Sequence, residues 1–283
     1  MTRYGRFALA VVGYALTLGI IAWGMSVGKF TLTPGDALIW DRVGDEVRAG
    51  ISPYYAVAGS GGFYYAPPWA VLFAPVSWLP VQVTALAIMA AEVASLRYIA
   101  GSWLRVGYVC WLPLVAFELP SAQVNLLMAA ALAAAVRGDP RAAMVMGAAK
   151  LSPVLAIREN WRRAVPVALA LGAVTLPVAG LWMDWIRQLG GTYGHVIASG
   201  AQIDVPFLPR LAVALVLVAT GRRWARVVGA VIATPAIYWV SAVMLLALVH
   251  RGSAEQQRDP LDRSLPGGGR AAVDVRRGGL DRP

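Results

Sequence analysis

The sequence FALAVVGYALTLGIIAWGMSVG occupies residues 7–28 and carries no charged side chain. A helix of this length, at about 1.5 Å per residue, is long enough to cross the roughly 30 Å hydrocarbon core of a bilayer. Arg3 and Arg6 precede it, and no small-x-small cleavage site stands before Lys29. Because positive charge stays on the cytoplasmic side, we interpret this segment as an uncleaved first membrane span, with the N-terminus inside.

The composition of the whole chain supports a membrane protein. Of 283 residues, 58% are hydrophobic and 14% are charged, and the mean hydropathy is +0.61, whereas about 25% of the residues in a soluble domain are charged. We therefore predict an all-α integral membrane protein, a polytopic helix bundle with about seven to nine spans over residues 1–250. Residues 251–283, rich in Arg and Gly, are predicted to be a disordered tail.

Charge and cysteine content exclude several classes of function. The net charge of +10 is better explained by Arg-rich cytoplasmic loops than by nucleic-acid binding. Cys110 is the single cysteine, so an internal disulfide is excluded. With two histidines, His195 and His250, a His-rich metal site is excluded as well. We expect neither a metal nor a cofactor.

Further apolar runs follow the first span. They predict two helices with a turn near Leu79–Pro80 over 66–98, a hairpin over 106–136 with a polar centre at 118–125, a re-entrant segment or two short helices over 142–157, and spans over 164–183, 207–221 and 227–249. Residues 184–206, with His195 and Asp204, then form a second outside loop. We read His195 as either an ordinary surface histidine or a catalyst.

The loop after the first span predicts an amphipathic helix over 34–49 on the outer membrane surface. Thr33 fits the N-cap and Pro34 the first helical position. One face of this helix is apolar, with side chains four residues apart: Ile39, Val43 and Val47. The opposite face is charged and carries Asp41, Asp45 and Arg48. Phe63, Tyr64 and Tyr65 then place aromatic side chains at the membrane interface.

Asp36, in the first turn of this helix, has two interpretations. It can act as a capping and dipole acid, which needs no substrate. It can also act as a general base that takes the proton of a sugar or lipid hydroxyl as that oxygen attacks a glycosyl phosphate. The residue pattern alone leaves both open.

Several polar side chains lie inside or beside apolar runs, where they usually face a bundle interior. Gln123 and Asn125 fit a helix start, interhelical hydrogen bonds or a substrate pocket. Lys150 fits either a cavity, where it neutralises a lipid phosphate or pairs with Glu118, or a snorkelling position at the cytoplasmic face. Arg210 fits either a contact with an anionic headgroup or a helix anchor.

Five short motifs, in order, resemble the polyprenol-phosphate-mannose-dependent α-1,2-mannosyltransferases of glycosyltransferase family 87, a GT-C membrane family often labelled a domain of unknown function. The motifs are Asp36 with Gly50-Ile-Ser-Pro53-Tyr54, Tyr64/Tyr65 with Pro67 and Leu79-Pro80, Gln123-Val124-Asn125, Lys150-Leu-Ser-Pro153 with Asn160-Trp161-Arg162-Arg163, and Pro235–Trp239. The resemblance covers about residues 30–250.

This resemblance implies a GT-C fold and a hexosyltransferase that moves a sugar, mannose in this family, from a polyprenyl phosphate to a lipid or glycan acceptor on the outer side of the plasma membrane, with inversion. It implies Asp36 as catalytic base. Lys150 and Arg210 are then expected at the donor phosphate, and Tyr54, Tyr65, Gln123 and Asn125 in the substrate pocket.

Two departures leave alternatives open. Ala122 replaces the Gly of the family's Gly-Gln-x-Asn element, and the apolar segments end near residue 250, earlier than in most members. A shortened, inactive member is one alternative. The other is a non-enzymatic multi-pass protein, such as a transporter or lipid-handling protein.

Overall fold

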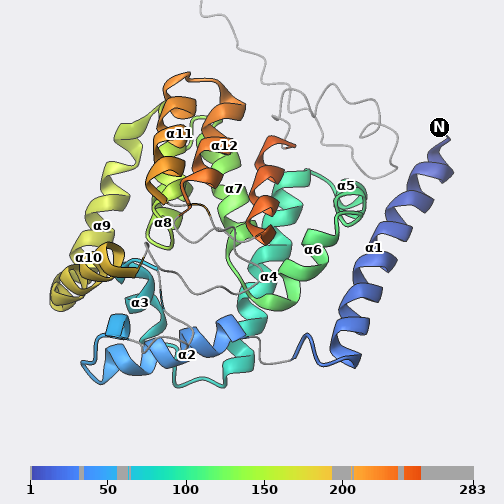
Figure 1. The fold of residues 1–283 in the computed structure, drawn as a ribbon. Helices are drawn as coiled ribbons and strands as arrows, with labels where there is room; N and C mark the ends of the chain where they lie inside the picture. The colour runs from blue at the N-terminus through green and yellow to red at the C-terminus, as the bar shows by residue number, and fades with distance from the viewer. Residues whose placement is uncertain are drawn as a thin grey trace, which may run out of the picture. The chain divides into compact units, whose positions relative to one another are not determined.

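The structure is a computed structural model, and it describes residues 2–31, 35–55, 63, 65–192, 205, 207–234 and 239–249. Every regular element in these ranges is a helix (Figure 1). The α-helices are α1 (Arg3–Ser26), α2 (Gly35–Arg48), α3 (Pro67–Phe73), α4 (Val81–Ala100), α5 (Trp103–Val109), α6 (Pro113–Glu118), α7 (Asn125–Ala135), α8 (Arg141–Gly147), α9 (Val165–Thr175), α10 (Gly180–Thr192), α11 (Phe207–Ala219) and α12 (Arg223–Ile232).

The other helical elements are 3₁₀ helices, most of them three to five residues long. They are η1 (Pro53–Tyr55), η2 (Leu119–Ser121), η3 (Ser152–Ala156), η4 (Trp161–Arg163), η5 (Leu176–Val178) and η6 (Trp239–Leu248). Proline stands at the start of η2, η3 and η5, where its missing N–H and fixed φ favour a helix start but not a continuing helix.

The helices confirm a helical membrane protein but not the predicted number of spans. Among the described residues, Tyr4–Ser26 and Val81–Ala100 are each long and apolar enough to cross a membrane. Two bent pairs meet the same standard together: Pro113–Ser121 with Asn125–Ala135, bent by 112°, and Trp161–Val178 with Gly180–Gln188, bent by 100°. The described part of the chain therefore holds two to four candidate spans, and the predicted seven to nine are not confirmed.

Three predicted spans differ from the observed helices. Residues 164–183 are broken, because α9 ends at Thr175 and α10 begins at Gly180 after η5, which contains Pro177. For 207–221, α11 has 13 residues, a length of about 20 Å that falls short of a membrane core. For 227–249, α12 ends at Ile232 and η6 begins at Trp239.

Other predicted elements agree with the structure. The first span corresponds to α1, the helix over 34–49 to α2, and the two helices over 66–98 to α3 and α4 with a turn between them. The polar centre of the 106–136 hairpin lies at the 112° bend between η2 and α7. Residues 142–157 form two short helices, α8 and η3.

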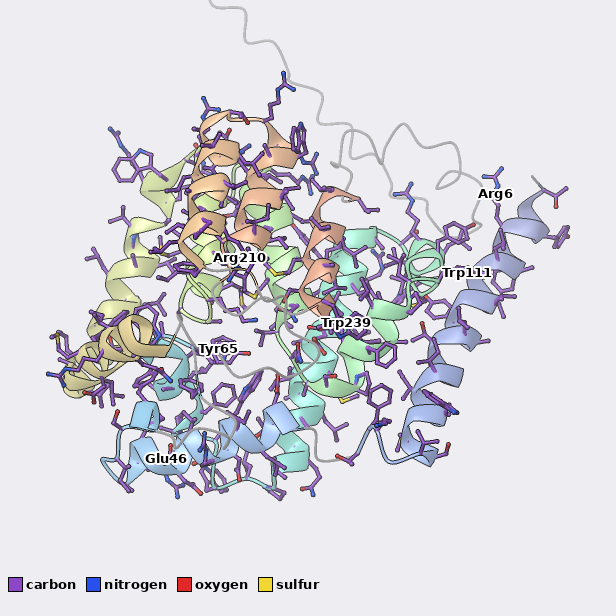
Figure 2. All side chains as sticks on the ribbon, in the orientation of Figure 1. Arg6, Glu46, Tyr65, Trp111, Arg210 and Trp239 are labelled. Atoms are coloured by element: carbon purple, nitrogen blue, oxygen red, sulfur yellow. The ribbon has the colours of Figure 1, made fainter. Side chains whose placement is uncertain are left out.

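Close glycine contacts join α1 to α5. A Cβ atom on Gly13 would overlap the carbonyl oxygen of Gly107, so the two backbones approach as glycine-mediated helix pairs in membranes do. Trp111 lies beside α1 in Figure 2, and its Nε1 donates to the carbonyl oxygen of Leu9 at 3.0 Å. The first predicted span is thus packed on the other helices along one side.

The helix α2 packs on α3 and α4, as Figure 1 shows. A Cβ atom on Gly44 would lie 2.6 Å from the carbonyl oxygen of Phe73 and 2.6 Å from Cβ of Ser77. Only glycine therefore permits this approach. Trp40, fully buried on the same side of α2, packs against Phe73 with their ring centroids 4.8 Å apart.

Candidate functional site

The buried face of α2 carries Asp36. Residues 36, 40 and 43 share one face of a helix, and Trp40 and Val43 are fully buried. Asp36 is itself partly covered, whereas Asp45 and Arg48 are exposed and form an ion pair of 3.2 Å. The structure therefore confirms the charged outer face that the sequence predicts and places Asp36 on the opposite side, toward the other helices.

The surroundings of Asp36 change its ionisation. Burial raises the pKa of this carboxyl to about 6, and the charge of Lys150 acts in the opposite direction. A pKa near the working pH suits a general base, because such a group is ionised at neutral pH and still accepts a proton well. A cap that points into water has no such shift. Burial is thus a feature that a general base needs and a solvent-exposed cap lacks, and both interpretations of Asp36 stay predictions.

A cluster of polar side chains surrounds the start of α7, and we call it the Asn125 cluster: Glu118, Gln123, Asn125 and Lys150. The backbone N–H of Asn125 donates to Glu118 Oε1 at 2.8 Å, and its Nδ2 donates to Glu118 Oε2 at 3.1 Å and to Gln123 Oε1 at 2.9 Å. Lys150 Nζ donates to Asn125 Oδ1 at 3.3 Å. The cluster thus joins the end of α6, the start of α7 and the turn between α8 and η3.

The local backbone explains why this cluster forms. The chain turns between η2 and α7 at Ala122, which has a left-handed φ of 50°. The turn exposes the first N–H groups of α7, and the carboxylate of Glu118 accepts one of them, as a capping acid does at the positive end of a helix. Glycine adopts a left-handed φ more readily than alanine does, so Ala122 holds a conformation that is unusual for its residue type.

Lys150, a member of the Asn125 cluster, also interacts electrostatically with Asp36 of α2. Burial lowers the pKa of Lys150, while the neighbouring carboxyls of Glu118 and Asp36 act in the opposite direction. Its Nζ also lies 5.7 Å from the centroid of the Tyr65 ring, within the range of a cation–π contact. Of the two sequence interpretations, the structure supports an inward-facing lysine over a snorkelling one.

Aromatic side chains form one wall of this region. Tyr54 donates its hydroxyl proton to the carbonyl oxygen of Tyr65 at 2.9 Å, and Phe63 packs against both rings. Figure 2 shows Tyr65 in the region between α2 and α11. Phe63 is fully buried, and its ring packs between the rings of Tyr54 and Tyr65; its place at the membrane interface stays a prediction.

Arg210 has its own set of partners. Its guanidinium donates to the carbonyl oxygens of Val205, at 2.9 Å, and of Ile232 and Thr234, at 2.9 and 2.8 Å. The last two lie at the C-terminal end of α12, where carbonyl groups lack helical partners and a cation is favourable. The anchoring interpretation of Arg210 is supported, and its role at a donor phosphate stays a prediction.

Some sequence predictions lie outside the described residues. These are Thr33, Pro34, Tyr64, His195, Asp204, His250, Pro235 and the tail 251–283. In the described part of the chain, no group of three or more His, Cys, Asp or Glu side chains is arranged to hold a metal ion.

Two residues of this region were missed at the sequence level. Glu92 is fully buried within α4 and interacts with Glu118 and Asp36. An acid in the interior of an apolar helix is itself a signal of a functional site. Trp69 is buried beside Tyr65, and its Nε1 has no hydrogen-bond acceptor. Sequence gives no signal that distinguishes this tryptophan from the others.

No family model, curated protein or solved structure matches the chain. The resemblance to glycosyltransferase family 87 therefore rests on the short motifs around Asp36, Tyr65, Gln123, Lys150 and Pro235.

Proposed function

We propose that the protein is a membrane glycosyltransferase of the GT-C type. It moves a sugar, mannose by the resemblance, from a polyprenyl phosphate to a lipid or glycan acceptor on the extracytoplasmic side. One observation carries the proposal: Asp36 of the first loop helix and Lys150, far apart in sequence, interact electrostatically beside Asn125 and Tyr65. The motifs of the family resemblance that contain these residues are thus neighbours in space.

In this proposal Asp36 is the catalytic base. Its carboxylate accepts the proton of an acceptor hydroxyl as that oxygen attacks the anomeric carbon of the donor sugar. The new carbon–oxygen bond forms as the bond between the sugar and the phosphate oxygen breaks, and the polyprenyl phosphate leaves with its electron pair. Attack from the face opposite the leaving group inverts the anomeric centre.

Lys150 offsets the negative charge that grows on the departing phosphate. A fixed cation in a site from which water is largely excluded stabilises such charge more strongly than one in water. The hydrogen bond from Lys150 to Asn125 and the contact with Tyr65 hold the ammonium in place before substrate binds. Arg210 is proposed as a second contact of the donor phosphate.

The remaining side chains supply the sugar and headgroup contacts. Gln123 and Asn125 offer amide groups, and Tyr54 and Tyr65 offer aromatic faces. The buried Nε1 of Trp69 lacks an acceptor; because a buried donor without a partner is unfavourable, a substrate hydroxyl is a suitable acceptor for it.

A transporter is the second candidate, and the two bent helix pairs favour it. Discontinuous helices with buried polar groups at the break line the substrate sites of many transporters, and the 112° bend carries Glu118 and Asn125. This candidate predicts substrate uptake into vesicles without any new glycosidic bond.

The test is sugar transfer in membranes that contain the full chain. Polyprenyl-phosphate mannose with a radiolabelled sugar is supplied, and label in lipid and glycan fractions is compared with that in membranes lacking the protein. The proposal expects label covalently joined to an acceptor. Label that enters sealed vesicles unchanged would favour the transporter, and transfer equal to that of the empty membranes contradicts the enzyme.

A further inference from the structure

Glu92 is a carboxyl group in the apolar interior of α4, and nothing in the proposed reaction uses it. Its side chain is fully buried, and neither Oε1 nor Oε2 accepts a hydrogen bond from a donor in the structure. It lies twelve residues into a helix that is long and apolar enough to cross a membrane. An ionised carboxylate in this position would be a buried charge without a compensating partner, which is energetically unfavourable.

The nearest ionisable partner of Glu92 is another acid. The carboxyls of Glu92 and Glu118 lie within hydrogen-bonding reach of each other. Two ionised carboxylates are acceptors only, so neither can donate to the other. A single proton removes the problem: it supplies the missing donor and cancels one of the two like charges.

The two acids differ in what else they contact. Glu118 accepts two hydrogen bonds from Asn125, at 2.8 and 3.1 Å, and these donors favour its ionised form. Glu92 has no such donors. The proton therefore belongs on Glu92, which donates it to the anionic Glu118.

The charges on neighbouring elements agree with this assignment. Asp36 of α2 adds a further negative charge near Glu92, and Lys150, after α8, compensates Glu118 and Asp36. The titratable side chains of α5, which packs on α4, are Arg105 and Tyr108. Arg97 lies on α4 more than one helical turn after Glu92, and its guanidinium lies 5.9 Å from the centroid of the Trp103 ring. One lysine balances at most one of three ionised carboxyls, so a neutral Glu92 leaves one net negative charge among these four groups instead of two.

We propose that Glu92 and Glu118 form a proton-binding site that holds one proton between two carboxyls in the apolar interior. The pair then carries one negative charge. This charge keeps Asn125 oriented through its two hydrogen bonds, so that the Asn125 Oδ1 faces Lys150. The site goes beyond the proposed transfer reaction and does not depend on it.

Infrared spectroscopy of the full chain in lipid nanodiscs tests this site. At neutral pH, the spectrum of the wild type minus that of Glu92→Gln is expected to contain the carbonyl band of a protonated carboxylic acid, shifted when D₂O replaces water. The matched difference for Glu118→Gln is expected to contain carboxylate bands. Carboxylate bands alone in the Glu92 difference would overturn the proposal.

A second measurement needs no variant. In the wild type, a protonated-carboxyl band is expected to persist at pH values where Asp36 and all exposed acids are ionised. Disappearance of every such band at neutral pH would overturn the proton-binding site. A failure of sugar transfer would contradict the proposed function only, because these bands are measured without substrate.

Discussion

At the scale of single residues, burial distinguishes carboxyls that share one helix. Asp45 is exposed and pairs with Arg48, and exposed ion pairs of this kind contribute little. Asp36 lies on the face that contacts other helices, and burial raises its pKa to about 6. The chemistry of the two side chains is identical, so their different roles come from which side of α2 each occupies.

The pH dependence of transfer follows from the ionisation of Asp36. A base must be deprotonated, so we expect the rate to be constant above neutral pH and to fall below about pH 6, by about tenfold at one unit lower. In Lys150→Gln the inflection is expected at a higher pH, because the charge that lowers the pKa of Asp36 is gone. The measurement is initial transfer rate against pH for both proteins. If the transfer rates of the two proteins inflect at the same pH, Lys150 does not influence the ionisation of Asp36, and the prediction is contradicted.

Most residues of this site could be predicted from the sequence, but their burial, ionisation and hydrogen-bond partners could not. Asp36, Gln123, Asn125 and Lys150 stand out as polar groups in or beside apolar runs. Glu92 was overlooked because the segment over 66–98 was interpreted only as two apolar helices, without attention to the acid inside the second. The hydrogen-bond partners of these side chains lie on segments that are distant in sequence, as Lys150 and Asn125 do. The order of residues along the chain does not show which distant segments will be in contact.

At the scale of elements, Gly44 sets the distance between α2 and α3. We expect Gly44→Val to cost about 1–3 kcal/mol of stability, as overpacking does, since its Cβ would lie 2.6 Å from the backbone oxygen of Phe73. Displacement of α2 also moves Asp36, so transfer should fall. Thermal unfolding in detergent and transfer rate are measured together, with Asp45→Ala on the exposed face of α2 as the control. A wild-type melting temperature for Gly44→Val would contradict the packing.

The α1–α5 contact gives a matched pair of glycines. A Cβ on Gly13 would overlap the Gly107 carbonyl, whereas one on Gly19 of the same helix meets nothing within 4 Å. We expect Gly13→Val to lower the midpoint of thermal unfolding and Gly19→Val to leave it near the wild-type value. Equal midpoints for the two variants would show that α1 does not pack through Gly13.

Apolar runs predicted where helices lie but not where they bend. The run over 164–183 has the length of a span, yet η5 interrupts it at Pro177 and the two parts are bent by 100°. Hydropathy records how apolar a segment is, whereas direction depends on proline and on packing against other helices. The 118–125 bend was predictable, because its polar residues interrupt the apolar run.

At the scale of the molecule, three Arg-rich turns are connected to one another. Asn160 Nδ2 donates to the carbonyl oxygen of Gly138 at 2.9 Å, and Arg226 pairs with Glu159 at 2.6 Å. These bonds join the turns around 137–141, 158–163 and 222–226, which together contain eight arginines and two acids: Arg137, Arg141, Arg158, Arg162, Arg163, Arg222, Arg223 and Arg226, with Asp139 and Glu159. Such clustering predicts a cytoplasmic end.

This charge distribution predicts the orientation of the chain. In a Cys110→Ala background, which removes the single native cysteine, we expect Ile51→Cys beside α2 to react with a membrane-impermeant maleimide on intact cells. Arg162→Cys should react only after the cells are opened; both native side chains are exposed. The reverse pattern would place Asp36 on the cytoplasmic side and contradict an extracytoplasmic site.

The central claim is that the Asp36 carboxylate acts as the base of sugar transfer. The most direct test compares initial transfer rates of Asp36→Asn and Asp45→Asn, two isosteric changes on one helix, at equal protein levels in membranes. The account predicts a loss of about 10²–10⁴-fold for Asp36→Asn and a wild-type rate for Asp45→Asn. Equal rates for the two variants would contradict it.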